Sequence, residues 1–192
     1  LFKTFDGFIS KLTNGIELDE DQKMVMAYLY KSEFENKNYR YTIMLTPDNN
    51  RVDAIRKLEE FKLIEKHSTS TSMHPVFILN RVLMKSEYFT ELRNIFGNNF
   101  DNMDNFYKDV LSIVYQFNEF SKTNEVSANM VGNRYYYVQH GNVTDVKIYD
   151  NFKRKVRNVI NKLKEKEYIT DVSKNRYKVN KDFKVKDSLF DK

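Results

Sequence analysis

The alternation of apolar and polar positions predicts long helices that each bury one face. Apolar residues recur at helical spacing between about Asp104 and Ser121, and we expect them to form a buried stripe. This stripe consists of Phe106, Val110, Ile113, Val114 and Phe117. A longer helix is predicted from Asp145 to about Lys166, with an apolar face of its own. That face consists of Val146, Tyr149, Phe152, Val156, Val159, Ile160 and Leu163.

Capping residues predict the ends of four further helices. Asp19 and Gln22 have the spacing of a capping box. Thr46–Pro47–Asp48 places a capping hydroxyl before a proline and an acid in the first turn. Ser127 can cap another helix, and Gly97 can end one. The four predicted helices span about 19–35, 47–61, 81–96 and 127–138.

One sequence pattern occurs twice. Ile55–Ile64 and Ile160–Ile169 both read Ile-x-Lys-Leu-x-Glu-x-x-apolar-Ile. Each copy is followed by a polar turn and then by a run with the composition of a strand, Val76–Asn80 or Arg176–Asn180. Another β-rich segment, Tyr39–Leu45, precedes the first copy. The repetition predicts two units, each with a helix that leads directly into a β-hairpin.

The order of elements around the second copy is helix, short helix, turn, helix and hairpin, which resembles the winged helix-turn-helix domains of bacterial regulators and replication initiators. The resemblance implies a mainly α fold with small β-hairpins (α+β), built from tandem winged-helix domains. We expect a winged-helix-like module with a linking helix at 1–96 and a winged helix-turn-helix module at 97–192. The first module is expected to be incomplete, because a strand rather than a helix is predicted between Glu35 and Thr46.

The positive charge of the chain is concentrated in its second half. The formal net charge is +5, and the first 96 residues carry equal numbers of acids and bases. Between Ser121 and Lys181, 14 Lys and Arg residues face 6 Asp and Glu residues, a local excess of 8 positive charges. A concentrated basic segment is typical of a protein that binds a polyanion. The alternative is an ordinary lysine-rich surface without a ligand.

The face of the long helix opposite its apolar stripe is a candidate for reading DNA. It carries Asn and Arg, which can form paired hydrogen bonds with adenine and guanine in the major groove of double-stranded DNA. The predicted wing, Ser173–Arg176, is basic and can reach the phosphate backbone. The candidate DNA-binding residues are Lys147, Asn151, Arg154, Lys155, Asn158, Lys174 and Arg176.

The corresponding helix of the first unit mixes acids and bases on its exposed positions. Acids facing phosphates would be repulsive, so this unit is expected to be an interaction module, including a homodimer contact. The exposed positions are Arg51, Asp53, Arg56, Lys57 and Glu59. The eight-residue loop of its hairpin, Ser68–Pro75, is rich in Ser and Thr and is expected to be a flexible loop.

Enzyme motifs are not found in the sequence. The five glycines form no phosphate-binding loop and no dinucleotide fingerprint. The three histidines, His67, His74 and His140, are scattered, so neither a metal site nor a cofactor is expected. Arg134–Tyr137 permits a nucleophilic tyrosine, but packing of the second helix against the long helix is the favoured interpretation.

The chain has no cysteine and no apolar run long enough for a membrane span, and we expect a cytoplasmic protein. Two functions stay open. The favoured one is a DNA-binding protein: a transcriptional regulator, a replication initiator, or the DNA-reading part of a larger protein, which a chain beginning with Leu1 would fit. The alternative is a protein–protein interaction scaffold built from winged helices. The basic excess favours DNA, because a scaffold has no need for it.

Overall fold

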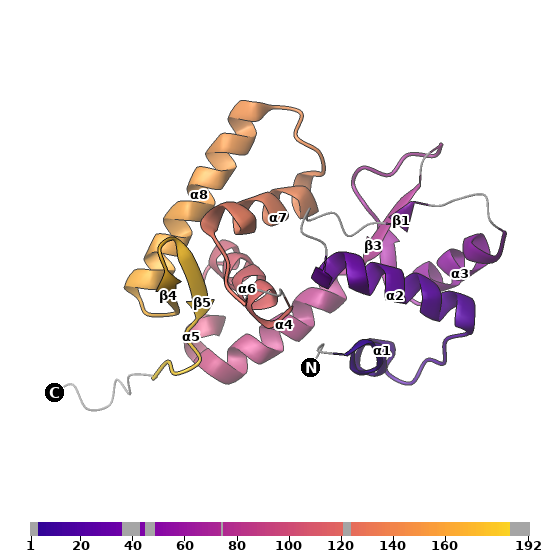
Figure 1. Cartoon of the computed structure of the whole chain (residues 1–192), viewed down its shortest axis with the longest axis horizontal. Coiled ribbons are helices and arrows are strands. Elements are labelled where there is room, and N and C mark those ends of the chain that lie inside the picture. The colour runs from indigo at the N-terminus through magenta and orange to yellow at the C-terminus, as the bar shows by residue number, and fades with distance from the viewer. Residues whose placement is uncertain (1–3, 36–42, 45–48, 74, 121–123, 185–192) are drawn as a thin grey trace.

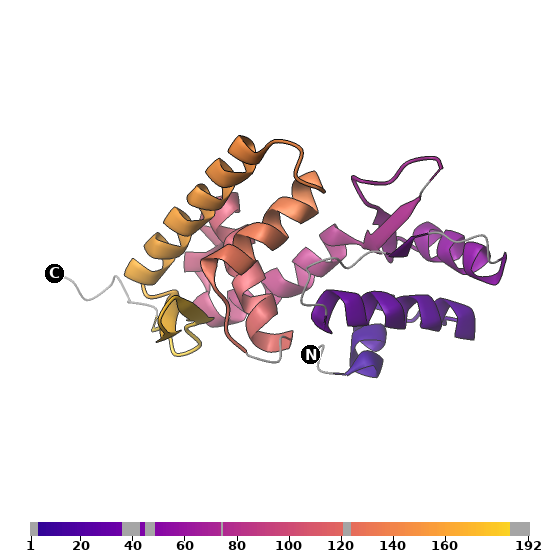
Figure 2. The ribbon, with the colours of Figure 1, turned by 45° about the horizontal axis from the view of Figure 1, so that its top comes forward.

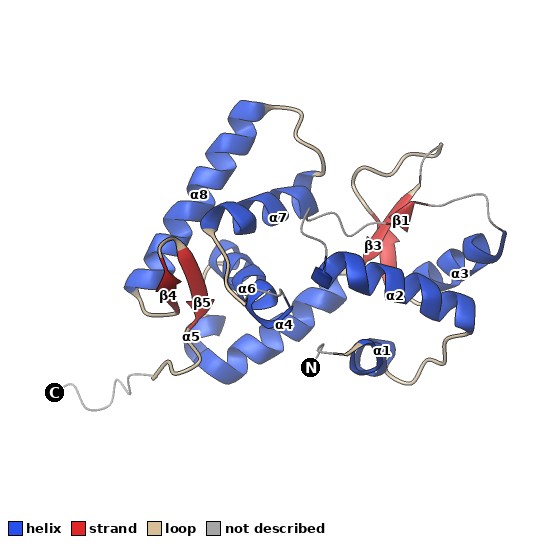
Figure 3. Cartoon of the chain, in the orientation of Figure 1, coloured by secondary structure: helices blue, strands red, loops and turns tan. Residues whose placement is uncertain are grey.

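The computed structural model describes residues 4–35, 43–44, 49–73, 75–120 and 124–184. In these ranges the chain is mainly helical and contains two small antiparallel β-sheets, as the sequence predicted (Figure 3). The helices are α1 Phe5–Thr13, α2 Glu20–Glu35, α3 Asn49–Glu60, α4 Arg81–Phe96, α5 Asn98–Asp101, α6 Asn105–Phe120, α7 Ala128–His140 and α8 Val146–Glu165. The strands are β1 Ile43–Met44, β2 Ile64–Lys66, β3 Val76–Leu79, β4 Ile169–Ser173 and β5 Arg176–Val179.

Most predicted helix ends are confirmed by their caps. The Asp19 carboxylate accepts the N–H of Gln22 at 2.8 Å, and the Gln22 side chain accepts the N–H of Asp19 at 3.0 Å. The Ser127 hydroxyl accepts the N–H of Met130 at 3.2 Å at the start of α7. Gly97 ends α4 with a positive φ of 57°. The predicted cap at 46–48 and most of the predicted strand 39–45 lie outside the described residues.

The two copies of the repeated pattern form the same local structure. In each unit a helix (α3 or α8) leads into an antiparallel hairpin (β2–β3 or β4–β5). Lys62 and Glu167 have positive φ values of 58° and 63° at the two junctions. Asn80 then donates to the carbonyl of Lys62 at 2.9 Å, and Asn180 donates to that of Glu167 at 2.8 Å. The repeated motif therefore includes the asparagine that ends each hairpin.

Equivalent residues of the two copies also have equivalent burial. Six side chains of the pattern are each at most 2% exposed. They are Ile55, Leu58 and Ile64 in the first unit and Ile160, Leu163 and Ile169 in the second.

In each unit a third extended segment pairs with the second strand of the hairpin. In the first unit β1 pairs with β3, which gives the order β1–β3–β2. In the second unit Val126, just before α7, forms an isolated bridge with Tyr177 of β5. Both units thus have an extended segment that precedes the helix–hairpin motif and pairs with the second strand of the hairpin.

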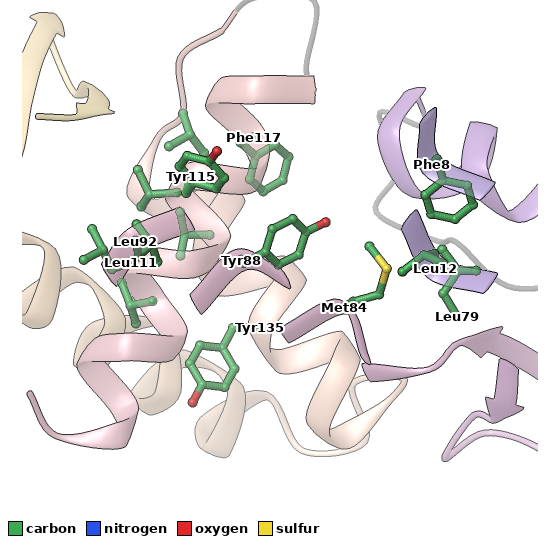
Figure 4. Close-up of a cluster of buried hydrophobic side chains, with 14 of the residues drawn as sticks. Phe8, Leu12, Leu79, Met84, Tyr88, Leu92, Leu111, Tyr115, Phe117 and Tyr135 are labelled. Atoms are coloured by element: carbon green, nitrogen blue, oxygen red, sulfur yellow. The ribbon is translucent and has the colours of Figure 1, made fainter. Parts of the chain in front are cut away.

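Helix α4 joins the two units and packs into both (Figure 1). Met84, in the first turn of α4, lies near Leu12 and Leu79 of the first unit, while Leu92 lies near Leu111 of α6 (Figure 4). At its end, the Phe96 ring lies 5.2 Å from that of Tyr168, between α8 and β4. The apolar core is therefore continuous from one unit to the other.

Two helices were not predicted from the sequence. Helix α1 starts at Thr4, whose hydroxyl accepts the N–H of Gly7 at 3.1 Å. It buries Phe8, whose ring lies 5.0 Å from that of Tyr30 on α2. Helix α5 is a single turn that follows Gly97 and buries Phe100. Helix α1 could have been found, because Phe5, Phe8, Ile9 and Leu12 recur at helical spacing, whereas the single turn of α5 is too short to show a period.

Candidate nucleic-acid interface

Helix α8 lies along the outside of the second unit, and its N-terminal end projects beyond α7 (Figures 1 and 2). The helix begins at the predicted residue, Asp145, whose carboxylate accepts the N–H groups of Lys147 at 2.9 Å and Ile148 at 3.1 Å. Both views also place the loop of the β2–β3 hairpin on the same side of the molecule as this end of α8.

The outer face of α8 has the predicted exposure. Lys147, Asn151, Arg154 and Asn158 are all exposed and follow one another at steps of four, three and four. Among the described residues, their side chains have no ion-pair or hydrogen-bond partner. Four polar side chains in a row on one helix face are therefore free to contact a ligand.

The inner face of α8 is buried only from its middle onwards. Val156, Ile160 and Leu163 are at most 1% exposed, as predicted. Val146, which was assigned to the same buried face, is 68% exposed, and this assignment is wrong. The reason is that α7 ends at His140, and within the described residues no element covers the first turn of α8. Ile148 is also exposed at this end, by 56%.

The lysines on the two sides of α8 lie against aromatic rings. The Lys155 ammonium lies 4.1 Å from the centre of the Phe106 ring of α6, although the side chain is exposed. On the other side the Lys153 ammonium lies 4.4 Å from the centre of the Tyr149 ring. Lys155 thus flanks the outer face from the α6 side, and its charge is partly engaged by a cation–π contact.

The predicted wing is a tight hairpin with two different basic residues. Lys174 is exposed at its tip, next to Asn175 in a left-handed conformation with φ 58°. Arg176 is half-buried, and its guanidinium lies 3.1 Å from the Met130 sulfur on α7. Lys174 therefore lies at the exposed tip of the hairpin, where its side chain can contact a ligand. Arg176, in contrast, also holds the hairpin against α7.

The hairpin is fixed to α6 by Asn118, which the sequence analysis did not single out. Its side chain accepts the N–H of Val179 at 2.8 Å and donates to the carbonyls of Tyr177 and Asn124, both at 3.2 Å. Asn118 is 8% exposed. The sequence could have indicated this role only through the position of Asn118 in an apolar helical stripe, because a buried polar residue requires hydrogen-bond partners.

One residue of the basic segment does not lie on the outer surface of the second unit. Arg134 is 3% exposed, and its guanidinium carbon lies 4.7 Å from the centre of the Phe117 ring of α6. The sequence analysis counted it among the bases available to a polyanion, and the structure corrects this. Arg134 occupies an inward-facing position on α7, which is stabilised by the aromatic ring rather than by solvent.

The three tyrosines after Arg134 have packing roles, and two of them pack as predicted. The Tyr135 ring lies 5.2 Å from that of Phe152 and the Tyr136 ring lies 5.0 Å from that of Tyr149, so both pack α7 against α8. The Tyr135 hydroxyl donates to Asp109 at 2.7 Å. Burial, together with this hydrogen bond to a carboxylate, raises the pKa of Tyr135 well above its usual value. Its phenolate form is therefore disfavoured.

Tyr137 instead contacts the first unit. Its ring stacks on that of His67 at 4.8 Å, and its carbonyl lies 3.3 Å from His67 Nε2. The His67 Nδ1 atom accepts the N–H of Thr69 at 3.2 Å. Burial lowers the pKa of His67, and the charge of Arg81 acts in the same direction, against the raising effect of the Tyr137 carbonyl.

The exposed charges of α3 pair with one another. Arg56 lies 3.3 Å from Asp53, and Lys57 lies 4.0 Å from Glu60. This face of the first unit therefore has mixed charge and differs from the outer face of α8.

The described residues contain no group of three or more His, Cys, Asp or Glu side chains that could hold a metal ion. None of the described helices combines the length and the apolar character needed to cross a membrane. The chain matches no protein-family model, no curated protein and no solved structure.

Proposed function

We propose that this chain is a double-stranded-DNA-binding protein built from two winged-helix units, with α8 as its recognition helix. The observation that carries the proposal is the outer face of α8, where Lys147, Asn151, Arg154 and Asn158 are exposed and lack partners within the described chain. An α-helix fits the major groove, and Arg and Asn are the residues that read guanine and adenine there. Lys174 at the tip of the β4–β5 hairpin would contact the backbone.

The order of elements supports the winged-helix assignment. In the second unit α6, the extended Val126, α7, α8 and the hairpin β4–β5 follow one another. The first unit repeats the last part of this order with β1, α3 and β2–β3. In such domains the last helix before the hairpin docks in the groove, and the hairpin lies beside it.

The first unit is assigned an interaction role, because the charges on α3 pair with one another and offer no uniformly positive face. A homodimer formed through this unit stays a prediction. Sedimentation velocity over a range of protein concentrations tests it directly, because a self-associating chain sediments faster as its concentration rises.

A protein-binding scaffold is the second candidate, and one observation favours it. Val143, Val146 and Ile148 are 44%, 68% and 56% exposed at the N-terminal end of α8. An apolar group of this kind is typical of a protein contact. The same side chains could also touch thymine methyl groups in a groove, so binding measurements are needed to decide.

The deciding experiment measures affinity for duplex DNA, single-stranded DNA and RNA by fluorescence anisotropy at several salt concentrations. Binding to duplex DNA should weaken with salt along a log–log slope of about −0.9 for each phosphate contacted. The double variant Lys147→Ala/Lys174→Ala should flatten that slope by about two units, because each lost phosphate contact removes about one.

The matched control is Lys57→Ala/Lys66→Ala, which removes the same charge from exposed positions of the first unit. It should leave the slope nearly unchanged. A slope near zero for the unaltered protein, or equal effects of both double variants, would favour the scaffold.

A further inference from the structure

A cleft of about 400 Å³ lies between the two units. Its walls come from β2 and the start of α4 on one side and from α6 and α7 on the other. This volume is within the range of about 300–1,000 Å³ that is typical of small-molecule sites. The cleft is therefore large enough for a small organic ligand that would touch both units at once.

The charges that line the cleft are unbalanced. Three cations, Arg81, Lys85 and Arg134, face two carboxylates, Glu65 and Asp109. One cation and one carboxylate of this set pair with each other, since Asp109 lies 2.6 Å from the Lys85 ammonium; Asp109 also accepts the Tyr135 hydroxyl at 2.7 Å. By formal charge the lining has an excess of one cation, three against two, which favours an anion.

Arg134 is the cation of the cleft whose charge is least screened by water. Its side chain is 3% exposed, so its interactions are only weakly screened by water. A guanidinium presents its N–H groups as a planar fork, which matches a carboxylate or a phosphate. The Phe117 ring lies behind the guanidinium at 4.7 Å and stabilises its position.

The remaining lining of the cleft is largely apolar and aromatic. The apolar and aromatic lining includes Met84 and Tyr88 of α4, which are 1% and 4% exposed, Ile113 of α6 and Val138 of α7. Val82, at the start of α4, is 77% exposed. Surfaces of this kind suit a flat apolar group, whose burial is favourable in proportion to the area removed from water.

We propose that this cleft binds a small organic anion with a flat apolar body, held by Arg134 and Lys85 through its acidic group. Because the ligand would contact both units, it would bias their arrangement. If the proposed DNA-binding function also holds, such a ligand would act as an effector of DNA binding.

The test uses the whole chain and direct binding, so it does not depend on DNA. Benzoate and phenyl phosphate are titrated by isothermal calorimetry at millimolar concentrations, with the neutral benzamide as a third probe. At least one of the two anions should bind with saturation and raise the melting temperature, whereas benzamide should not. The comparison of benzoate with phenyl phosphate tells which acidic group the cleft takes.

Two variants locate the site. Lys85→Met removes a cation and frees Asp109 to repel the ligand, so affinity should fall at least about tenfold, which corresponds to about 1.4 kcal/mol. Lys11→Met is the matched control, because Lys11 is a similarly exposed lysine paired with Glu87 at 3.4 Å outside the cleft. Arg134→Met should abolish binding.

If Arg134→Met does not fold, the Lys85 and Lys11 variants decide alone. The proposal is overturned if neither anion binds the folded protein, if benzamide binds as well as benzoate, or if Lys85→Met and Lys11→Met bind alike.

Discussion

Individual polar residues in the second unit divide into those that hold the fold and those that face outwards. Asn118 and Arg134 are buried, whereas Asn151, Arg154 and Asn158 are exposed. In the sequence all five look alike, as polar residues in or near helices with apolar stripes. The helical period placed the three residues of α8 on the outer face correctly, because α8 has one strongly apolar side. No face was assigned to Arg134, which the sequence analysis counted only by its charge.

Asn118→Ala should destabilise the protein. It would leave the N–H of Val179 and two carbonyls without their present partner, and an unsatisfied buried polar group costs about 1–3 kcal/mol. Urea unfolding measures the loss. The control is Asn161→Ala, an exposed position on α8, which should change the free energy of unfolding by no more than about 0.5 kcal/mol. Equal effects of the two changes would show that Asn118 does not anchor the hairpin.

Arg154→Ala should change the free energy of unfolding by no more than about 0.5 kcal/mol, because the side chain is exposed and has no partner among the described residues. On a binding site found by selection from random duplexes, it should cost about 1–3 kcal/mol of affinity, and far less on unselected DNA. Anisotropy titrations with both duplexes measure the difference. An equal loss on both would mean that Arg154 contacts phosphate and does not read bases.

At the scale of elements, the helix–hairpin junctions were the most predictable part of the chain. The repeated pattern contains the buried residues, the turn and the final asparagine, so local sequence determines the local structure. The start of α8 was predicted less well. Its cap at Asp145 was correct, but the burial of Val146 depends on where α7 ends, and helical periodicity carries no information about a neighbouring element.

The contact between the end of α7 and the first hairpin can be tested with two glycines. Gly97 and Gly141 end α4 and α7 with similar backbone angles, φ 57° and ψ −139° against φ 73° and ψ −136°. A Cβ atom at Gly97 would meet nothing within 4 Å, whereas one at Gly141 would lie 2.6 Å from the Thr69 methyl group.

Both changes to alanine should therefore introduce backbone strain of about 1–3 kcal/mol. Gly141→Ala should cost a further amount of about 1 kcal/mol or more, because it overpacks the contact with Thr69. Chemical denaturation of both variants gives the difference. If Gly97→Ala were the more destabilising of the two, the contact between α7 and the first hairpin would not be tight in solution.

At the scale of the whole molecule, sequence reasoning predicted two units and the helix that links them, but not how the units pack against each other. His67 was considered only as an unlikely metal ligand, yet it lies between the units and stacks on Tyr137, 70 residues further along the chain. The cleft between the units has walls from four elements. Such features depend on how separate elements pack, and no local pattern encodes them.

His67 should make stability depend on pH. Its pKa is lowered in the folded protein, mainly by burial, from the usual 6.5, so the unfolded chain binds the proton more readily. The free energy of unfolding should therefore be unaffected by His67 above pH 6.5 and should fall as the pH drops from 6.5 through the folded-state pKa. Between pH 6.5 and the folded-state pKa of His67, the urea concentration at the unfolding midpoint should change less with pH in His67→Gln than in the unaltered protein. A variant with the same pH profile as the original would exclude His67 as the cause.

The shared helix α4 has a consequence for how this protein could change over evolutionary time. Phe96 packs its ring 5.2 Å from both Tyr168 and Phe183, while Met84, at the other end of the helix, is buried with residues of the first unit. A second unit excised at Gly97 would lose Phe96 and leave the Tyr168 and Phe183 rings without this contact. Although the two units repeat one motif, neither can therefore be replaced by the other without loss of packing on α4. A substitution on one side of α4 must be compatible with the packing on the other, so the halves are constrained to evolve together.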